Sequence, residues 1–185
     1  MYDTAFRNLS DRELHCFCHS SNWEQLSPEA RLQVCQELHN RYADEHHMER
    51  CEITVEPMRG TLFGEYDPSS GSIHLNQSVL EDGTIVTQNG EHREYEGSNA
   101  ETIDTLFHET SHAYDDQLAQ AAENHLEGAQ ANTELLNDAQ LRNLDVDLIR
   151  ASNSIYITIT KNEDMYRVQD CEKRAFEAGE SETRH

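Results

Sequence analysis

Apolar residues recur at three- and four-residue spacing in two stretches of the chain, which predicts two amphipathic helices. The first should run from Pro28 to about His46, with Ser27 as its N-cap and proline at its first position. The second should run from about Asn99 to Asn124, after a capping box that Ser98 opens. The apolar positions of the second helix are Ile103, Leu106, Phe107, Ala113, Tyr114, Leu118 and Ala121.

Between these helices, short segments rich in β-branched residues and bounded by turn residues predict strands. Asp67–Gly71 should join the second and third strands as an antiparallel hairpin, and Asn89-Gly90 favours a tight turn between the last two. The strands are expected over Glu52–Met58, Leu62–Tyr66, Ser72–Gln77, Thr84–Gln88 and Glu91–Tyr95. Hairpins beside long helices predict an α+β fold with a small, mostly antiparallel sheet.

The last third of the chain is predicted to be mainly helical. Residues 129–150 are polar but carry leucines at helical spacing. Ser154 to Thr160 alternates cleanly and predicts a half-buried strand, after which Asn162 would cap a helix from Asp164 to Ala178. Since no linker or repeat divides the chain, we expect a single domain over 28–185, with 1–27 as an N-terminal extension of unclear structure.

Charge narrows the classes of partner. The chain has 185 residues, of which 36 are acidic and 14 basic, and its net charge is -22. Binding to nucleic acid is therefore not expected, because no basic stripe is present to neutralise phosphates. An anionic membrane surface is not expected for the same reason.

Cysteine usage and hydropathy indicate the compartment. The odd number of cysteines forms no disulfide framework, which is typical of reduced thiols in a cytosol-like environment. These are Cys16, Cys18, Cys35, Cys51 and Cys171. No apolar signal region is present, and no apolar run approaches the roughly 20 residues of a membrane span. We expect a soluble protein that is cytoplasmic, or exported without a cleavable signal peptide.

Five residues of the second helix, His108-Glu109-Thr110-Ser111-His112, match the pattern H-E-x-x-H. Positions i and i+4 share one face of a helix, so His108 and His112 can aim two imidazole nitrogens at one metal ion, with zinc expected. Glu109 cannot easily ligate the same ion, but it can act as the general base that takes a proton from the metal-activated water. The alternative is that both histidines are polar groups on the helix surface.

A catalytic zinc usually takes three protein ligands, so another element must supply the third. Glu172 has apolar helical neighbours, and coordinating a metal would remove the cost of burying its carboxylate there. Glu134 has the Glu-x-x-x-Asp spacing of thermolysin-like proteases, but its polar neighbours indicate a solvated face. Glu172 could also simply pair with an arginine. The remaining candidates are Asp115, Asp116, Glu177 and a third histidine.

A second group of potential ligands lies near the N-terminus, in His15-Cys16-Phe17-Cys18-His19. Four potential metal ligands, two histidines and two cysteines, occupy five positions there. Helix or strand geometry would scatter them over several faces, and no partner pair with the usual spacing follows. The segment is therefore either a second metal site or a short element with two half-buried cysteines.

Thr105–Tyr114, followed by Glu172-x-x-Ala175, resembles small bacterial zincin metallopeptidases of the type carried by mobile elements and by toxin or effector cassettes, including the ImmA/IrrE-like peptidases. The resemblance implies a zincin-like domain over 28–185, in which a small sheet packs on the H-E-x-x-H helix. It also implies one zinc per chain with His108, His112 and Glu172 as ligands and Glu109 as base. Asp170-Cys171 departs from many relatives, which have a proline before the ligand segment.

The expected function is therefore that of a zinc-dependent metallopeptidase that hydrolyses a protein or peptide substrate, as a toxin, effector or regulatory protease. Ser72–Asn76 is similar to the substrate-side edge strand of those peptidases, so an extended substrate would add as a strand near His74 and Asn76. Tyr156 or Tyr166 could supply a donor to the oxyanion. The alternative is a non-catalytic zincin scaffold that binds a metal or a partner protein. The sequence does not indicate the oligomeric state.

Overall fold

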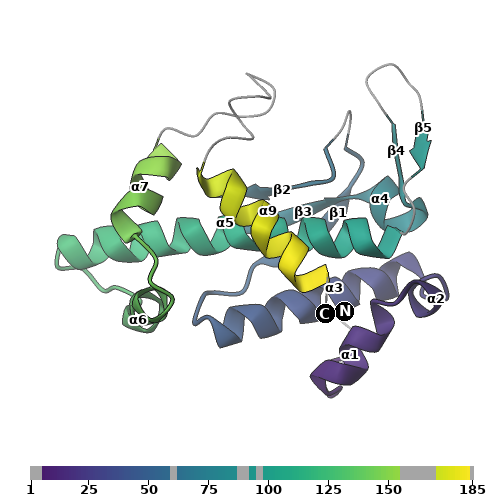
Figure 1. Cartoon of the computed structure of the whole chain (residues 1–185), viewed down its shortest axis with the longest axis horizontal. Helices are drawn as coiled ribbons and strands as arrows, with labels where there is room; N and C mark the ends of the chain where they lie inside the picture. Colours follow the sequence, from purple (N-terminus) through teal and green to yellow (C-terminus); the bar gives the residue numbers. More distant parts are fainter. Residues whose placement is uncertain (1–5, 59–61, 87–91, 95–97, 155–169, 184–185) are drawn as a thin grey trace.

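The computed structural model describes residues 6–58, 62–86, 92–94, 98–154 and 170–183, and their fold is α+β, as expected. The helices are α1 (Asp11–Phe17), α2 (Ser20–Trp23), α3 (Pro28–Glu45), α4 (Gln77–Asp82), α5 (Ser98–Leu126), α6 (Thr133–Leu141), α7 (Val146–Ser154) and α9 (Asp170–Thr183). The strands are β1 (Glu52–Glu56), β2 (Gly64–Asp67), β3 (Ser72–Asn76), β4 (Thr84–Val86) and β5 (His92–Glu94). Figure 1 shows α5 running the length of the molecule.

The three-stranded sheet has the order β1-β3-β2. β3 pairs antiparallel with β2, as the predicted hairpin requires, but parallel with β1, so the sheet is mixed and the expectation of a mostly antiparallel one is wrong. The physical reason is that the hairpin partner β2 already pairs with one side of β3. The free side of β3 pairs with β1, which runs in the same direction as β3. The last two predicted strands form a separate antiparallel pair, β4 and β5, and the predicted turn at Asn89-Gly90 lies outside the described residues.

The central position of β3 corrects a second expectation. Ile73 and Leu75 are almost fully buried on one face of the strand, and Asn76 is 1% exposed. Because both of its sides are already hydrogen-bonded, β3 cannot accept an added strand near His74 and Asn76. The edges of this sheet are β1 and β2, and the edge strand in contact with α5 is β2.

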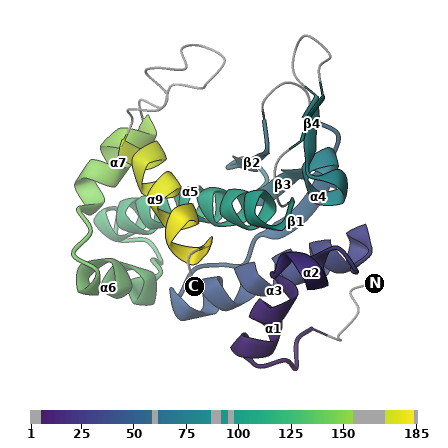
Figure 2. The same cartoon turned by 45° about the vertical axis from the view of Figure 1, so that its right-hand side comes forward.

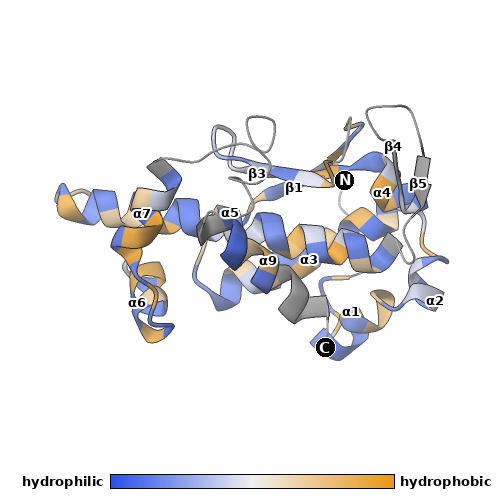
Figure 3. Cartoon of the chain, turned by 45° about the horizontal axis from the view of Figure 1, so that its top comes forward, coloured by the Kyte–Doolittle hydropathy of each residue, from blue (hydrophilic) through white to orange (hydrophobic). Residues whose placement is uncertain are grey.

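The core lies where the sheet meets α3 and α5. Both helices show the mixture of apolar and polar positions that the periodicity predicts (Figure 3). The turned view in Figure 2 shows α9 lying across α5, and this is the most extensive contact between two of the described helices. Fully or almost fully buried core residues include Val34, Leu38, Ile53, Ile73, Leu75, Leu106 and Leu118. This packing holds the middle of α5 between the sheet and α9.

Several predicted ends of elements can be compared with the structure. Ser27 caps α3 as expected, because its hydroxyl accepts a hydrogen bond from the N–H of Ala30. The side chain of Ser98 lies outside the described residues. The helical stretch over 129–150 is interrupted between α6 and α7, where Asn143 has a φ of 56°. The strand predicted from Ser154 to Thr160 is wrong at its first residue, because Ser154 ends α7, and its remainder, 155–160, lies outside the described residues. The start of the last predicted helix, 164–169, lies outside them as well.

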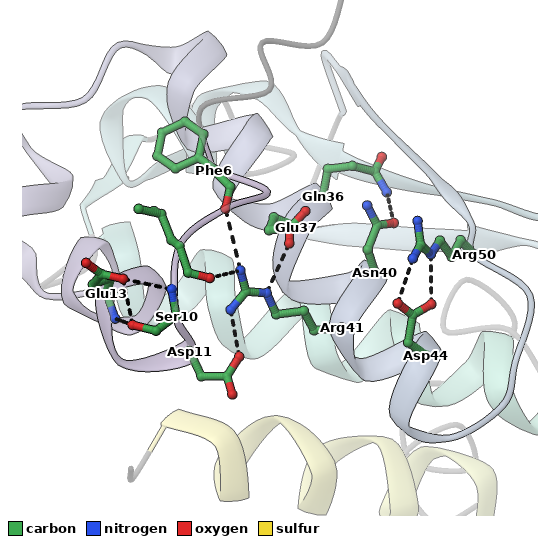
Figure 4. Close-up of polar contacts among 11 residues, drawn as sticks. Phe6, Ser10, Asp11, Glu13, Gln36, Glu37, Asn40, Arg41, Asp44 and Arg50 are labelled. Carbon is green, nitrogen blue, oxygen red and sulfur yellow. Dashed lines mark hydrogen bonds and ion pairs between the residues drawn. The ribbon is translucent and has the colours of Figure 1, made fainter.

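The N-terminal segment is folded against α3. Leu14 and Trp23 are fully buried and belong to the same core cluster as the sheet. Arg41 of α3 fixes the segment by donating to the carboxylate of Asp11 and to the carbonyl of Leu9, while its Nε donates to Glu37 (Figure 4). Among the described helices, none has both the length and the apolar character that crossing a bilayer requires.

Candidate metal centre

The middle of α5 presents two histidines on one face. His108 and His112 are one helical turn apart, and their Nε2 atoms lie 3.2 Å from each other. Their side chains are 8% and 14% exposed, so both are turned into the protein rather than onto the helix surface. The i, i+4 spacing therefore produces the convergence of imidazole nitrogens that the motif predicts.

α9 adds a carboxylate to this pair. Glu172 is fully buried, with Oε2 3.3 Å from His108 Nε2 and Oε1 3.3 Å from His112 Nε2. Within the described part of the chain, these three residues form the one group of histidine, cysteine or acidic side chains whose ligand atoms are close enough to hold a metal ion. Residues 60 positions apart in the sequence, His112 and Glu172, thus meet at one point.

The spacing of the three donors fits a small tetrahedral ion. Bonds of about 2.0–2.2 Å in a tetrahedral zinc site place neighbouring ligand atoms roughly 3.3–3.6 Å apart. The three separations here are 3.2, 3.3 and 3.3 Å. Two imidazoles with one carboxylate are also an established set of protein ligands for a catalytic zinc, which leaves a fourth position for water or substrate.

The surrounding charges favour a cation at this point. Burial alone would lower the pKa of His112, but the hydrogen bond to Glu172 and the nearby carboxylates of Glu109 and Asp115 outweigh it and raise that pKa. Burial raises the pKa of Asp115, which Arg174 partly offsets. A positive charge placed between the imidazoles would therefore be stabilised by several buried carboxylates.

Glu109 is buried but is not one of the three grouped residues. Its Oε2 accepts a hydrogen bond of 2.8 Å from the backbone N–H of Tyr66 in β2. The phenol of Tyr66 donates to Asp116 of α5 at 2.9 Å. Tyr66 therefore connects the edge strand to the motif helix at two points, and the backbone of β2 fixes one oxygen of the Glu109 carboxylate.

The other acidic candidates for a third ligand lie elsewhere. The side chain of Glu134 is 78% exposed and faces His47. Asp115 accepts hydrogen bonds from Arg174, Asp116 accepts them from Tyr66 and Gln120, and Glu177 is exposed.

The sequence also suggests a second metal site near the N-terminus and two tyrosines as donors to the oxyanion. His15, Cys16, Cys18 and His19 form no metal-binding group in the part of the chain that the structure describes. Cys16 is exposed and Cys18 is half-buried, so one of the two expected half-buried cysteines is found. Tyr156 and Tyr166 lie outside the described residues.

Two residues beside the site were not recognised from the sequence. His39 of α3 is fully buried, with Nδ1 3.0 Å from the hydroxyl of Thr110 and Nε2 accepting from the N–H of Cys51. Arg174 of α9 lies two positions after Glu172 and donates to Asp115. The buried face of α3 could have indicated His39, since it falls one residue after Leu38 in the apolar stripe. No local pattern pairs Arg174 with Asp115.

Comparisons of this chain with protein-family models, with curated proteins and with solved structures found no match. The interpretation of the site therefore rests on its own residues and geometry.

Proposed function

We propose that the protein is a zinc-dependent peptidase. The observation that carries the proposal is the convergence of His108, His112 and Glu172, with the carboxylate of Glu109 beside them but outside the group. A purely structural zinc site is usually closed by four protein ligands and has no use for a neighbouring base. The resemblance of the two motifs to small bacterial zincin peptidases supports the same reaction class and a zincin-like arrangement.

The roles of the side chains follow from their positions. A zinc ion bound by the three residues would supply Lewis acidity, which polarises the scissile carbonyl and makes a water molecule easier to deprotonate. Glu109 would take the proton from the attacking water and pass it to the leaving amine. Its hydrogen bond from the Tyr66 N–H holds Oε2, which would leave Oε1 to take the proton.

The edge strand β2 is suited to bind an extended peptide beside this carboxylate. Asn76 donates its N–H to the carbonyl of Phe63, and the register pairs Glu65 with His74. Because hydrogen-bonded and non-bonded pairs alternate in an antiparallel ladder, the backbone groups of Gly64 and Tyr66 point away from β3. The N–H of Tyr66 is already bound to Glu109, so a substrate that adds as a strand along this outer edge would pair with Gly64 and with the carbonyl of Tyr66, and would pass close to Glu109.

The rival function is a non-catalytic module that holds a metal or a partner protein. A metal-free alternative is that the two imidazoles and the carboxylate simply share protons. The first alternative predicts zinc without turnover, and the second predicts a folded protein without zinc. Both differ from the proposal in a measurable way.

The test combines metal analysis with proteolysis profiling of tag-free protein. Wild type should contain close to one zinc per chain and cleave members of a peptide library, and His112→Ala should lose most of the zinc. Glu109→Gln should keep the zinc but lose activity by about 10²–10⁴-fold, which is the usual range for general acid–base catalysis. Glu134→Gln, an exposed carboxylate on α6, is the control and should retain both properties. Folded, zinc-free wild type or equal turnover in Glu109→Gln would contradict the proposal.

A further inference from the structure

One ion pair joins the two helices that supply the grouped residues. Asp115 follows His112 by three positions on α5, and Arg174 follows Glu172 by two positions on α9. Arg174 donates to Asp115 Oδ2 from Nη2 at 2.5 Å and from Nε at 3.1 Å. The side chains of Asp115 and Arg174 are 5% and 23% exposed, so the pair lies largely within the interface between the helices.

The position of Glu172 depends on how α9 lies on α5. Ala175 is fully buried, and the ring of Phe176 contacts the ring of His108 with centroids 4.6 Å apart. These apolar contacts are not directional, so they do not by themselves determine how far α9 slides or rotates along α5. A hydrogen-bonded ion pair with two donors to one oxygen is directional, and it fixes that position close to the ligand atoms.

We propose that the Asp115–Arg174 pair is a positioning device that sets α9 against α5 and thereby holds the carboxylate of Glu172 beside the two imidazoles. The inference rests on the proposed function, because it assigns the pair a role at the zinc site. Neither residue is a ligand. Arg174 acts through Glu172 on the same helix, and Asp115 acts by anchoring Arg174.

Positioning and simple electrostatics predict opposite results for the loss of Arg174. Removing its positive charge near the site would by itself make a cation bind more tightly. Removing the ion pair that positions α9 would instead misplace Glu172 and weaken the affinity for the cation. Arg174→Lys sharpens the comparison, since it keeps the charge but replaces the planar fork of donors by a single ammonium. Electrostatics alone predicts no change for that variant.

The experiment measures zinc affinity of the full chain by competition with a chromophoric chelator, with circular dichroism as the check on folding. Arg174→Met should weaken zinc binding by about 10–100-fold, the usual cost of losing a residue that orients a metal ligand. Arg174→Lys should show a smaller loss in the same direction. Arg50→Met is the matched control, because it breaks an exposed arginine–aspartate pair with Asp44 and should leave zinc affinity unchanged (Figure 4).

Cobalt(II) substitution gives a second readout that does not depend on activity. Loss of the carboxylate from the coordination sphere should change the visible absorption of the cobalt form in Arg174→Lys, which keeps its charge and is the variant more certain to fold. Unchanged or tighter zinc binding in both Arg174 variants, with wild type binding zinc, would overturn the positioning role alone. Failure of wild type to bind zinc would instead overturn the proposed function, and this inference with it.

Discussion

The backbone N–H of Tyr66 lies 2.8 Å from Oε2 of Glu109, so the edge strand of the sheet and the carboxylate of the motif helix are joined directly. The same residue reaches α5 a second time through its phenol, which donates to Asp116. The placement of β2 along α5 and the orientation of Glu109 are therefore not independent. Changes that shift β2 should act on catalysis as well as on stability.

Tyr66→Phe tests this connection. It removes the bond to Asp116 while keeping the backbone donor, so we expect a loss of about 1 kcal/mol in the free energy of unfolding and a clear fall in kcat/KM. Tyr114→Phe is the matched control, because Tyr114 makes an equivalent 2.9 Å bond to Asp138 on α6. Urea denaturation and peptide hydrolysis should show similar destabilisation of both variants but reduced activity only for Tyr66→Phe. Equal activity in the two would contradict the connection.

Glu172→Gln should weaken zinc binding more than any change to a residue that only orients a ligand. The substitution keeps the size of a fully buried side chain but removes its charge, so we expect a loss beyond about 100-fold, the upper end for orienting residues. Glu134→Gln should leave zinc affinity unchanged, because that side chain is solvated. Chelator competition on both variants decides between them. If Glu134→Gln weakened zinc binding more than Glu172→Gln, Glu134 would be the third zinc ligand instead.

Gly64→Ala should force β2 away from α5. A Cβ at this position would lie 2.7 Å from Cγ2 of Thr105 and 2.9 Å from the backbone oxygen of His74. We expect destabilisation of about 1–3 kcal/mol, the usual cost of overpacking, with reduced peptidase activity. Thr105→Ser removes one of the two clashes and should restore part of the stability in the double variant. If Gly64→Ala unfolds at the same urea concentration as wild type, the close approach of strand and helix is not rigid.

His39 should make stability depend on pH. Burial, with a smaller contribution from Arg50, lowers its pKa from 6.5 to about 4. Between these two values the unfolded chain therefore binds more protons than the folded chain. The free energy of unfolding is thus unaffected by His39 above pH 6.5 and falls as the pH drops towards 4. At about 1.4 kcal/mol per pKa unit, the free energy of unfolding should fall by ~3 kcal/mol through His39 once the pH reaches about 4.

The measurement compares urea denaturation of wild type and His39→Gln from pH 7.5 to 4.5. The variant loses the titrating ring, so its stability should decline less steeply over this range even if it is less stable at neutral pH. Carboxylates titrate in both proteins and cancel in the difference. Parallel curves for the two proteins would show that His39 does not titrate in this way.

The sequence by itself determined the features that depend on neighbours along the chain. Helix periodicity, the cap at Ser27 and the turn at Asp67–Gly71 are set within a few residues, and the structure has them where they were expected. The convergence of His108 and His112 follows from helical spacing alone. The apolar neighbours of Glu172 favour it as the third ligand, because a carboxylate in such a stripe needs a compensating partner, and the structure brings it beside both histidines.

Only the tertiary structure decided the features that depend on contacts between distant segments. The order β1-β3-β2 could not be predicted, because an alternating strand carries no signal for the neighbour on its second side. The bond from the Tyr66 N–H to Glu109 depends on which backbone groups of β2 face outward, and that follows from the register with β3. Asp115 and Arg174 are ordinary charged residues in the sequence. They become partners because packing places α9 across α5, and helix packing is set by the shapes of whole faces rather than by any local pattern.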